Sequence, residues 1–282
     1  MARYAVIGHP VEHSQSPWIH GTFAEQTGQL LQYEKLLAPL DGFASCLEKF
    51  ARSTEPCAHG CNITVPFKAQ AFSMAPHRTT RAQLAGAANT LRFDAEGWLA
   101  DNTDGAGLVT DIQVNAGTLL KGLRVLLIGA GGAAAGAIGP LLEARPAELI
   151  VSNRTSGNAQ ALVARHQSVV SRGTVLKATA LSDCGESFDV IINASASSLQ
   201  GEPLPVTRKV FKPGSLALDM MYGPAAQAFM EAATQEGAIP RDGLGMLVEQ
   251  AAEAFHLWRG VRPHTKQVLA QLRQKMRDHS VG

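Results

Sequence analysis

RVLLIGAGGAAAGAIGPLLEARPAELIVSNRT, residues 124–155, is the stretch of this chain that predicts its fold most directly. Arg124 to Ile128 form a mostly apolar run typical of a buried strand, and Gly129 to Gly132 interrupt that run. An Ala-rich segment then predicts a helix, and Glu148 to Ser152 predict a second strand. The stretch therefore predicts a βαβ unit.

The glycine spacing within this unit favours a dinucleotide site. Gly129 permits a tight turn, Gly131 lets the backbone approach a pyrophosphate, and Ala134 is small enough for the helix to pack closely on the strand. The free amide groups and the dipole of a helix start both favour phosphate. A purely structural Gly-rich turn is the alternative, but the flanking strands and helix favour the nucleotide site.

Asn153, Arg154 and Thr155 follow the second predicted strand. A cofactor with a free ribose 2′-hydroxyl usually meets Asp or Glu about 20 residues after the glycines. Here a guanidinium, which suits a phosphate and can stack on adenine, takes that place. We therefore expect NADP(H) rather than NAD(H), the alternative being that Arg154 is an ordinary solvated arginine.

Composition narrows the class of protein. The 282 residues allow two domains with separate cores, although one large domain is possible. The net charge of +1 and the lack of a long basic or acidic block argue against nucleic acid or a membrane surface as partner. No stretch reaches the ~18 apolar residues of a spanning helix, and the N-terminus resembles no signal peptide, so we expect a soluble cytoplasmic protein.

The four cysteines, Cys46, Cys57, Cys61 and Cys184, include no C-x-x-C pair, so we expect reduced thiols. Cys57, His59 and Cys61 lack a fourth ligand at ordinary spacing, and we predict no metal site.

Residues 1–104 predict a first α/β domain. Strands are expected at Tyr4–Ile7, Gln32–Leu37, Cys61–Val65 and on either side of a turn at Asp94–Gly97, and helices near Pro17, at Asp41–Ala51 and near Thr79–Leu84. Ser14 and Ser16 follow the first strand, where open α/β sheets bind ligands. Ser16 also precedes Pro17 as a helix cap would, so capping is the alternative role.

Two further strand ends carry polar side chains. CNITVPFK, residues 61–68, brings Thr64 and Lys68 to one of them, and a lysine drawn toward a pocket binds an anion or moves a proton. The alternative is a surface lysine in the first turn of a helix. Asn89 starts another strand, and Asp104 is placed to cap a helix at Ala106–Val114, which does not exclude a second role.

Beyond Thr155, strands expected near Thr174–Ala178, at Asp189–Asn193 and at Ser215–Met221 alternate with helices, which predicts a parallel Rossmann-like sheet. From Asp242 a Gly-rich loop leads into a helix whose apolar stripe contains Gln250, either a ligand or a hydrogen-bonded core residue. A last helix at Thr265–Lys275 is expected to pack on the first domain. The predicted domains are residues 1–104 with 243–282, and residues 105–242.

Seven motifs in order resemble the shikimate dehydrogenase family over nearly the whole chain: HSQSP (13–17), NITVPFK (62–68), GAANT (86–90), DNTDG (101–105), GAGGA (129–133), NRT (153–155) and DGLGMLVEQAA (242–252). The resemblance implies an N-terminal α/β substrate domain completed by C-terminal helices, a Rossmann-like NADP-binding domain and a substrate cleft between them. It also implies the reversible NADPH-dependent reduction of 3-dehydroshikimate to shikimate, a step toward chorismate and the aromatic amino acids.

By resemblance, Lys68 and Asp104 are the catalytic pair. Ketone reduction needs a proton at the developing alkoxide, which a lysine ammonium can donate and stabilise. Which of the two residues carries that proton is left open. The implied substrate-binding residues are Ser14, Ser16, Thr64, Lys68, Asn89, Asp104, Tyr222 and Gln250. The implied cofactor-binding residues are Gly129, Ala130, Gly131, Gly132, Ala133, Asn153, Arg154, Thr155, Met220 and Gly243.

The chain departs from the family pattern in four places. Ala135 and Asn158 stand where basic residues are common, so recognition of the 2′-phosphate depends more on Arg154. The family's N-A-T-S is Asn193 to Ala196 here, and Gln227 replaces a threonine. Two alternatives therefore stay open: a quinate/shikimate dehydrogenase that accepts NAD, and a catalytically silent ligand-binding paralogue. We expect a monomer or a homodimer.

Overall fold

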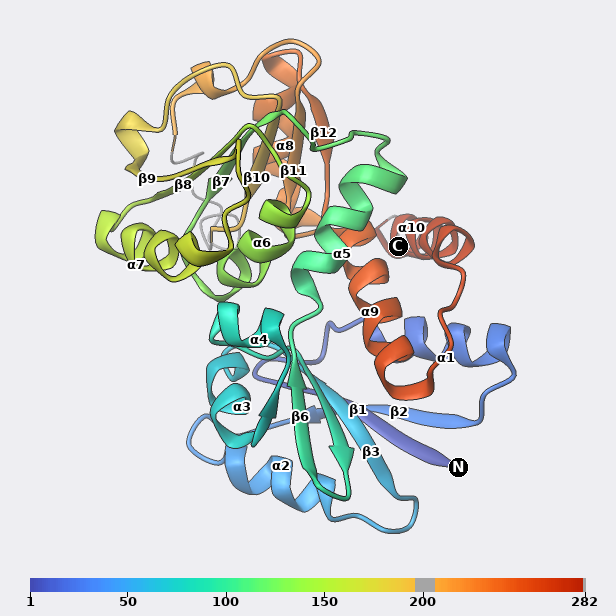
Figure 1. Ribbon diagram of the computed structural model, residues 1–282. Coiled ribbons are helices and arrows are strands. Elements are labelled where there is room, and N and C mark those ends of the chain that lie inside the picture. The colour runs from blue at the N-terminus through green and yellow to red at the C-terminus, as the bar shows by residue number, and fades with distance from the viewer. Residues whose placement is uncertain (196–205, 281–282) are drawn as a thin grey trace. The chain divides into compact units, whose positions relative to one another are not determined.

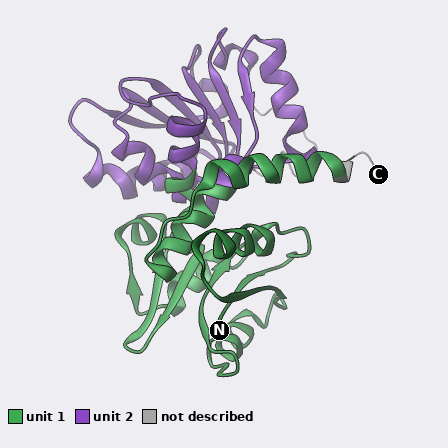
Figure 2. Ribbon diagram, turned by 90° about the vertical axis from the view of Figure 1, so that its right-hand side faces the viewer, with its two compact units in different colours: residues 1–107, 248–282 green, residues 108–247 purple. Residues whose placement is uncertain are grey.

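The computed structural model describes residues 1–195 and 206–280, without the side chains of 279 and 280. The chain packs as two units, drawn in two colours in Figure 2: residues 1–107 with 248–282 form unit 1, and residues 108–247 form unit 2. The chain passes between them inside helices α5 (Asp104–Thr110) and α9 (Leu244–Arg259). The domain boundaries predicted from the sequence, 104/105 and 242/243, stay a prediction.

Unit 1 contains a six-stranded mixed sheet (Figure 1). Its strands are β1 (Ala2–Gly8), β2 (Leu31–Leu37), β3 (Ala58–Ile63), β4 (His77–Arg78), β5 (Thr90–Asp94) and β6 (Gly97–Asp101), in the order β2-β1-β3-β5-β6-β4. β1 is parallel to both β2 and β3, whereas β5 runs antiparallel to β3 and β6. The carboxyl ends of β1 and β3 therefore meet at one edge of the sheet.

Helices cover both faces of this sheet. They are α1 (Ser16–Thr27), α2 (Phe43–Ala51), α3 (Lys68–Met74), α4 (Thr80–Ala85), α9 and α10 (Thr265–Ser280). Because strand side chains alternate between faces, Ile7 and Ile63 join a core with Phe43 and Leu47 of α2. On the other face Tyr4 stacks on Trp258 of α9, with ring centroids 4.6 Å apart.

Two predicted helix caps are wrong. Helix α1 follows Gln15 and already includes Ser16, whose amide donates a hydrogen bond to Ser14 Oγ at 3.3 Å. Helix α5 likewise begins at Asp104, and the Asn102 side chain accepts the Asp104 amide at 3.2 Å. The predictions used only the local sequence pattern of helix caps. Helix α1 starts one residue earlier than predicted, and helix α5 starts two residues earlier.

Unit 2 contains a second sheet of six strands: β7 (Arg124–Ile128), β8 (Glu148–Asn153), β9 (Val175–Ala180), β10 (Val190–Asn193), β11 (Leu216–Asp219) and β12 (Ile239–Arg241). Every neighbouring pair is parallel, and the order β12-β11-β10-β7-β8-β9 is the Rossmann arrangement. The predicted two-part α/β fold with a Rossmann-like domain is thus confirmed.

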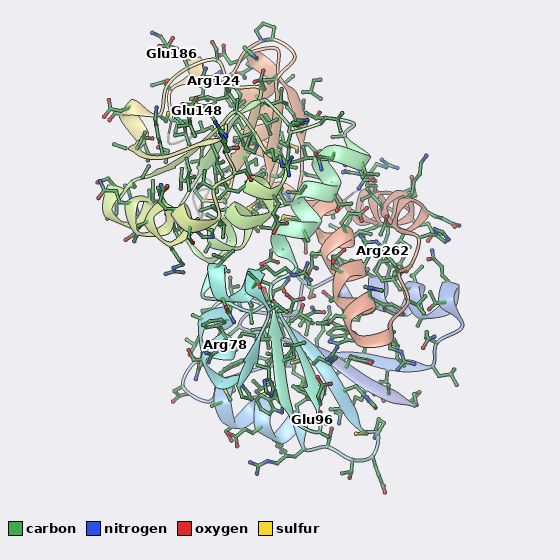
Figure 3. All side chains as sticks on the ribbon, viewed as in Figure 1. Arg78, Glu96, Arg124, Glu148, Glu186 and Arg262 are labelled. Carbon is green, nitrogen blue, oxygen red and sulfur yellow. The ribbon has the colours of Figure 1, made fainter. Side chains whose placement is uncertain are left out.

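The helices of unit 2 are α6 (Gly132–Glu143), α7 (Ser156–His166) and α8 (Pro224–Gln235), with short helical turns η1 (Asp111–Asn115), η2 (Gln167–Val169), η3 (Leu181–Asp183) and η5 (Arg208–Val210). At the amino ends of β7 and β8, Arg124 Nε lies 2.9 Å from Glu148 Oε2 (Figure 3). Strand β7 pairs with the buried strand β10 and is itself buried from Val125 to Ile128. This burial explains the apolar run at the start of residues 124–155.

Candidate active site

Lys68 and Asp104, predicted as a pair, form an ion pair in unit 1. Each is the first residue of its helix, α3 and α5, and Lys68 Nζ lies 2.5 Å from Asp104 Oδ2. The Asp104 side chain is 8% exposed and that of Lys68 is 21% exposed. The Asp104 side chain is therefore almost excluded from solvent, whereas the Lys68 side chain is partly exposed.

The Asn89 amide joins this pair to Gln250. Asn89 Nδ2 donates to Asp104 Oδ1 at 2.8 Å and to Gln250 Oε1 at 3.0 Å. Asn89 directly precedes β5, and Gln250 lies on α9, so residues far apart in the chain meet here. The sequence left open whether Gln250 is a ligand or a hydrogen-bonded core residue. In the structure Gln250 is hydrogen-bonded and lies beside the ion pair.

Thr103 belongs to this cluster, although the sequence analysis did not single it out. It is fully buried, its Oγ1 lies 2.8 Å from Asn89 Nδ2, and its amide donates to Asn89 Oδ1 at 2.8 Å. Its position inside DNTDG was the available signal. A threonine before an expected helix is more typical of a cap, which is why the pattern did not reveal it.

Ser14, Ser16 and Thr64 lie at the carboxyl ends of β1 and β3. Ser14 Oγ donates to Ser16 Oγ at 3.2 Å, and Ser16 is buried while Ser14 is half-buried. A Cβ added to Gly8 would lie 2.2 Å from Thr64 Cγ2, so only glycine lets Thr64 approach β1 this closely. Hydroxyl donors thus collect at the edge of the sheet where α/β proteins bind ligands.

The Gly-rich turn of unit 2 requires glycine at one position and is open at two others. Gly129 has a φ of +111°, and a Cβ there would lie 2.9 Å from the Ala194 backbone, so the turn requires glycine. A Cβ added to Gly131 or Gly132 would meet nothing within 4 Å. Open space therefore lies beside both glycines at the start of α6, next to Ala130 and Ala133.

The end of β8 carries the predicted residues Asn153, Arg154 and Thr155. Arg154 and Thr155 are exposed, and Asn153 Nδ2 donates to the Thr155 carbonyl at 3.0 Å, which fixes the turn into α7. Of the positions that depart from the family pattern, Asn158 is exposed on α7 and Ala135 is buried inside α6. Arg154 is therefore the cation that β8 presents at this turn.

The remaining predicted residues of unit 2 lie near the carboxyl ends of β10 and β11. The Met220 amide donates to the Asn193 carbonyl at 2.9 Å, and a Cβ on Gly243 would lie 2.3 Å from the Met220 carbonyl oxygen. Tyr222 is half-buried, and burial raises the pKa of its hydroxyl. Ser195 Oγ donates to Asn193 Oδ1 at 2.7 Å, whereas Ala196 lies outside the described residues.

The four cysteines are free thiols. Within residues 1–195 and 206–280, no three His, Cys, Asp or Glu side chains are grouped as metal ligands would be. None of the described helices is long and apolar enough to cross a membrane.

Three family models match the chain: the shikimate dehydrogenase substrate binding domain over residues 6–91, shikimate / quinate 5-dehydrogenase over residues 112–202, and the shikimate 5′-dehydrogenase C-terminal domain over residues 243–273. The shikimate dehydrogenase (NADP(+)) of Methylibium petroleiphilum is 59% identical over 275 residues, covering 96% of this chain and 94% of its own. That of Paracidovorax citrulli is 58% identical and covers 97% of each chain.

Solved structures agree. The crystal structure of an Ael1 enzyme from Pseudomonas putida has a TM-score of 0.88 and 43% identity, covering 96% of this chain and 98% of its own. Shikimate 5-dehydrogenase from Thermus thermophilus, solved in complex with NADP(H) and shikimate, has a TM-score of 0.84 and 31% identity, covering 97% and 99%. With relatives this similar over nearly its whole length, the chain belongs to the shikimate dehydrogenase family.

Proposed function

We propose that this protein is an NADP-dependent shikimate dehydrogenase that reversibly reduces 3-dehydroshikimate to shikimate. Family membership supports the reaction and the cofactor. The observation that carries the proposal in this chain is the Lys68–Asp104 ion pair, joined by Asn89 to Gln250. A catalytically silent paralogue would have no use for a proton donor placed in this way.

Lys68 is proposed as the proton donor. When bound, NADPH supplies the hydride, and the oxygen of the ketone then needs a proton. The Lys68 side chain is 21% exposed, and Asp104 Oδ2, 2.5 Å from Lys68 Nζ, orients the ammonium group. A cation beside the oxygen also stabilises the negative charge as it develops. In the oxidation direction, the same amine takes the proton back.

The substrate is proposed to bind through neutral donors. Ser14 and Ser16 hydroxyls would hold the carboxylate, and Thr64, Asn89 and Gln250 would bind the ring hydroxyls. Neutral hydrogen bonds to a carboxylate are weaker than those of an arginine, so affinity is spread over many contacts. Tyr222 stays a prediction as a further substrate contact.

The cofactor is proposed to bind unit 2. Residues 129–133 would hold the pyrophosphate at the start of α6, where the backbone faces open space. Asn153, Arg154 and Thr155 would bind the 2′-phosphate, and Met220 and Gly243 would line the nicotinamide end. The expectation of a monomer or a homodimer stays a prediction.

Quinate oxidation with NAD⁺ is the second candidate. The neutral residues Ala135 and Asn158 favour it, because they leave Arg154 to discriminate between the cofactors. Purified protein assayed with shikimate and quinate, each with NADP⁺ and NAD⁺, separates the two. We expect the highest kcat/KM for shikimate with NADP⁺. Faster turnover of quinate or a preference for NAD⁺ would favour the second candidate, and folded protein inactive in all four assays would contradict both.

A further inference from the structure

A row of hydrogen-bonded side chains crosses the sheet of unit 1 and ends at Asn89. Tyr33 on β2 donates through its hydroxyl to Asn62 Oδ1 at 2.7 Å. Asn62 on β3 donates through Nδ2 to Thr90 Oγ1 at 3.0 Å, and Thr90 on β5 donates to Asn89 Oδ1 at 3.0 Å. Asn62 and Thr90 are opposite each other in the pairing of β3 with β5, so the strand register places them in contact (strands in Figure 1). We call Tyr33, Asn62 and Thr90 the relay.

The direction of these hydrogen bonds is determined by the groups that take part. Asn62 Nδ2 also donates to the Asn89 carbonyl at 3.3 Å, so Asn62 Oδ1 must face Tyr33. The Thr90 hydroxyl has one proton and accepts from Asn62, which leaves that proton for Asn89 Oδ1. Thr90 and the Thr103 amide thus both donate to Asn89 Oδ1, which directs the Asn89 NH₂ group to Asp104. Every donor in the relay thus points toward the carboxylate.

Burial strengthens the relay. Thr90 is fully buried, Asn62 is 6% exposed and Asn89 is 3% exposed, so their hydrogen bonds form in a low dielectric where successive bonds polarise one another. Burial raises the pKa of the Tyr33 hydroxyl well above its ordinary value, although a hydrogen bond from Ser16 opposes this, so Tyr33 remains a donor at neutral pH. His20 lies flat against the Tyr33 ring, with centroids 4.5 Å apart, and fixes its position.

We propose that Tyr33 and Thr90 are positioning residues for the reduction. Acting through Asn62, they keep the Asn89 amide in the orientation that donates to Asp104, and Asp104 in turn holds Lys68. Because Ser16 contacts Tyr33, the relay joins the serines at one end of the site to the ion pair at the other. This inference rests on the proposed function, since it assigns the residues a role in the same reaction.

Matched substitutions test the role of the hydroxyl groups. Thr90→Val and Tyr33→Phe each remove one relay hydroxyl, and we expect kcat for shikimate to fall about tenfold with KM changed less than about threefold, because an ion pair out of position affects the chemical step more than binding. Thr90→Ser keeps the hydroxyl and should restore kcat to within about twofold.

Tyr4→Phe is the control. Tyr4 is also fully buried on this face of the sheet, and no hydrogen bond joins its hydroxyl to Asn62, Thr90 or Asn89 in the part of the chain that is described. Unchanged kcat in both Thr90→Val and Tyr33→Phe would overturn the proposal. An equal loss in Tyr4→Phe and Thr90→Ser would also overturn it, because general loosening of the core would then explain the effect.

Solvent exchange of the Asn89 side-chain protons does not depend on turnover, so measuring it tests the relay separately from the proposed function. The side-chain NH₂ protons of Asn89, assigned by their loss in Asn89→Asp, should exchange with solvent faster in Thr90→Val than in the wild type or in Thr90→Ser. Equal exchange rates in all three proteins would overturn the relay even if the wild type is active. Inactive wild-type protein with the expected exchange pattern would instead contradict the proposed function alone.

Discussion

At the scale of single residues, we predict that Arg154 discriminates between NADP⁺ and NAD⁺. It is exposed at the end of β8, whereas Ala135 is buried and Asn158 is neutral. We expect Arg154→Ala to lower kcat/KM for NADP⁺ about tenfold to a hundredfold, since a hydrogen bond to a charged group contributes about 1.5–3 kcal/mol. The kcat/KM of Arg154→Ala for NAD⁺ should stay within about twofold of the wild-type value. Arg172→Ala, at an exposed turn of the same unit, is the control, and equal losses with both cofactors would contradict this role for Arg154.

Substitution by alanine should have different effects at Gly129 and at Gly131. Gly129→Ala places a Cβ 2.9 Å from the Ala194 backbone at a φ of +111°, so unit 2 should lose stability. Gly131→Ala meets no atom within 4 Å, so stability should hold while NADP⁺ affinity falls, because the Cβ occupies space proposed for the pyrophosphate. Thermal unfolding and calorimetric NADP⁺ titration of both variants check this. Undiminished NADP⁺ affinity in a folded Gly131→Ala protein would show that the turn does not hold the cofactor.

At the scale of elements, an ion-pair network joins α4 and β6 to α9. Arg81 on α4 binds both oxygens of Asp101 at 2.6 Å and reaches Glu253 on α9 at 3.3 Å, and Glu253 also binds Arg262. Because Asp101 is 1% exposed, Arg81→Met should leave a buried charge unpaired and destabilise unit 1 by about 3 kcal/mol.

Arg52→Met is the matched control for this prediction. Arg52 pairs with Glu48 on the surface, with side chains 80% and 46% exposed, and its loss should cost less than about 1 kcal/mol. Trp18, Trp98 and Trp258 are the three tryptophans of the chain and all lie in unit 1, so the urea midpoint of their fluorescence reports on that unit alone. Equal midpoints for the two variants would show that the network contributes little.

At the scale of the whole molecule, unit 1 should lose stability in acid in two steps. Burial lowers the pKa of His20 from 6.5 to about 3. Below about pH 6.5, His20 therefore binds a proton in the unfolded chain but not in the folded chain. The free energy of unfolding then falls by up to about 1.4 kcal/mol for each pH unit of acidification. Burial alone would raise the pKa of Asp101 and Glu253, but Arg81 lowers the pKa of Asp101, and Arg262 and Arg81 lower that of Glu253. The contribution of these two carboxylates is therefore present above about pH 4.3 and is lost only in stronger acid.

The interval between pH 6.5 and 4.5 isolates His20. The urea midpoint of tryptophan fluorescence should fall across this interval in the wild type and in the exposed control His264→Gln, but less steeply in His20→Phe. Parallel slopes for His20→Phe and the wild type would assign the acid sensitivity to another group.

The sequence predicts those structural features that depend on residues close together in the chain, and it predicts less well those that depend on distant segments. The parallel sheet of unit 2 followed from alternating strands and helices, because crossover connections leave few alternatives. The hairpin of β5 and β6 was visible from the turn at Asp94–Gly97. The position of β4 at the edge of the sheet was not, because a two-residue strand beside β6 depends on pairing rather than on its own sequence.

The candidate site shows the same division. Lys68, Asp104, Asn89 and Gln250 were singled out, and the structure brings all four together. The capping role predicted for Asp104 was wrong because its partners Lys68 and Asn89 are 36 and 15 residues away, beyond a local rule. Tyr33 was missed because a tyrosine in a strand resembles any other core aromatic until its hydroxyl partner is known.

Turnover of Lys68→Ala, with shikimate affinity measured by calorimetry in parallel, tests most directly the claim that unit 1 supplies the proton for ketone reduction. We expect kcat with shikimate and NADP⁺ to fall about 10²-fold or more while the dissociation constant of shikimate changes much less, as loss of general acid–base catalysis requires. Lys266→Ala, an exposed lysine of the same unit, should keep full activity. A folded Lys68→Ala protein that retains most of its kcat would contradict the assignment of the proton to this ion pair.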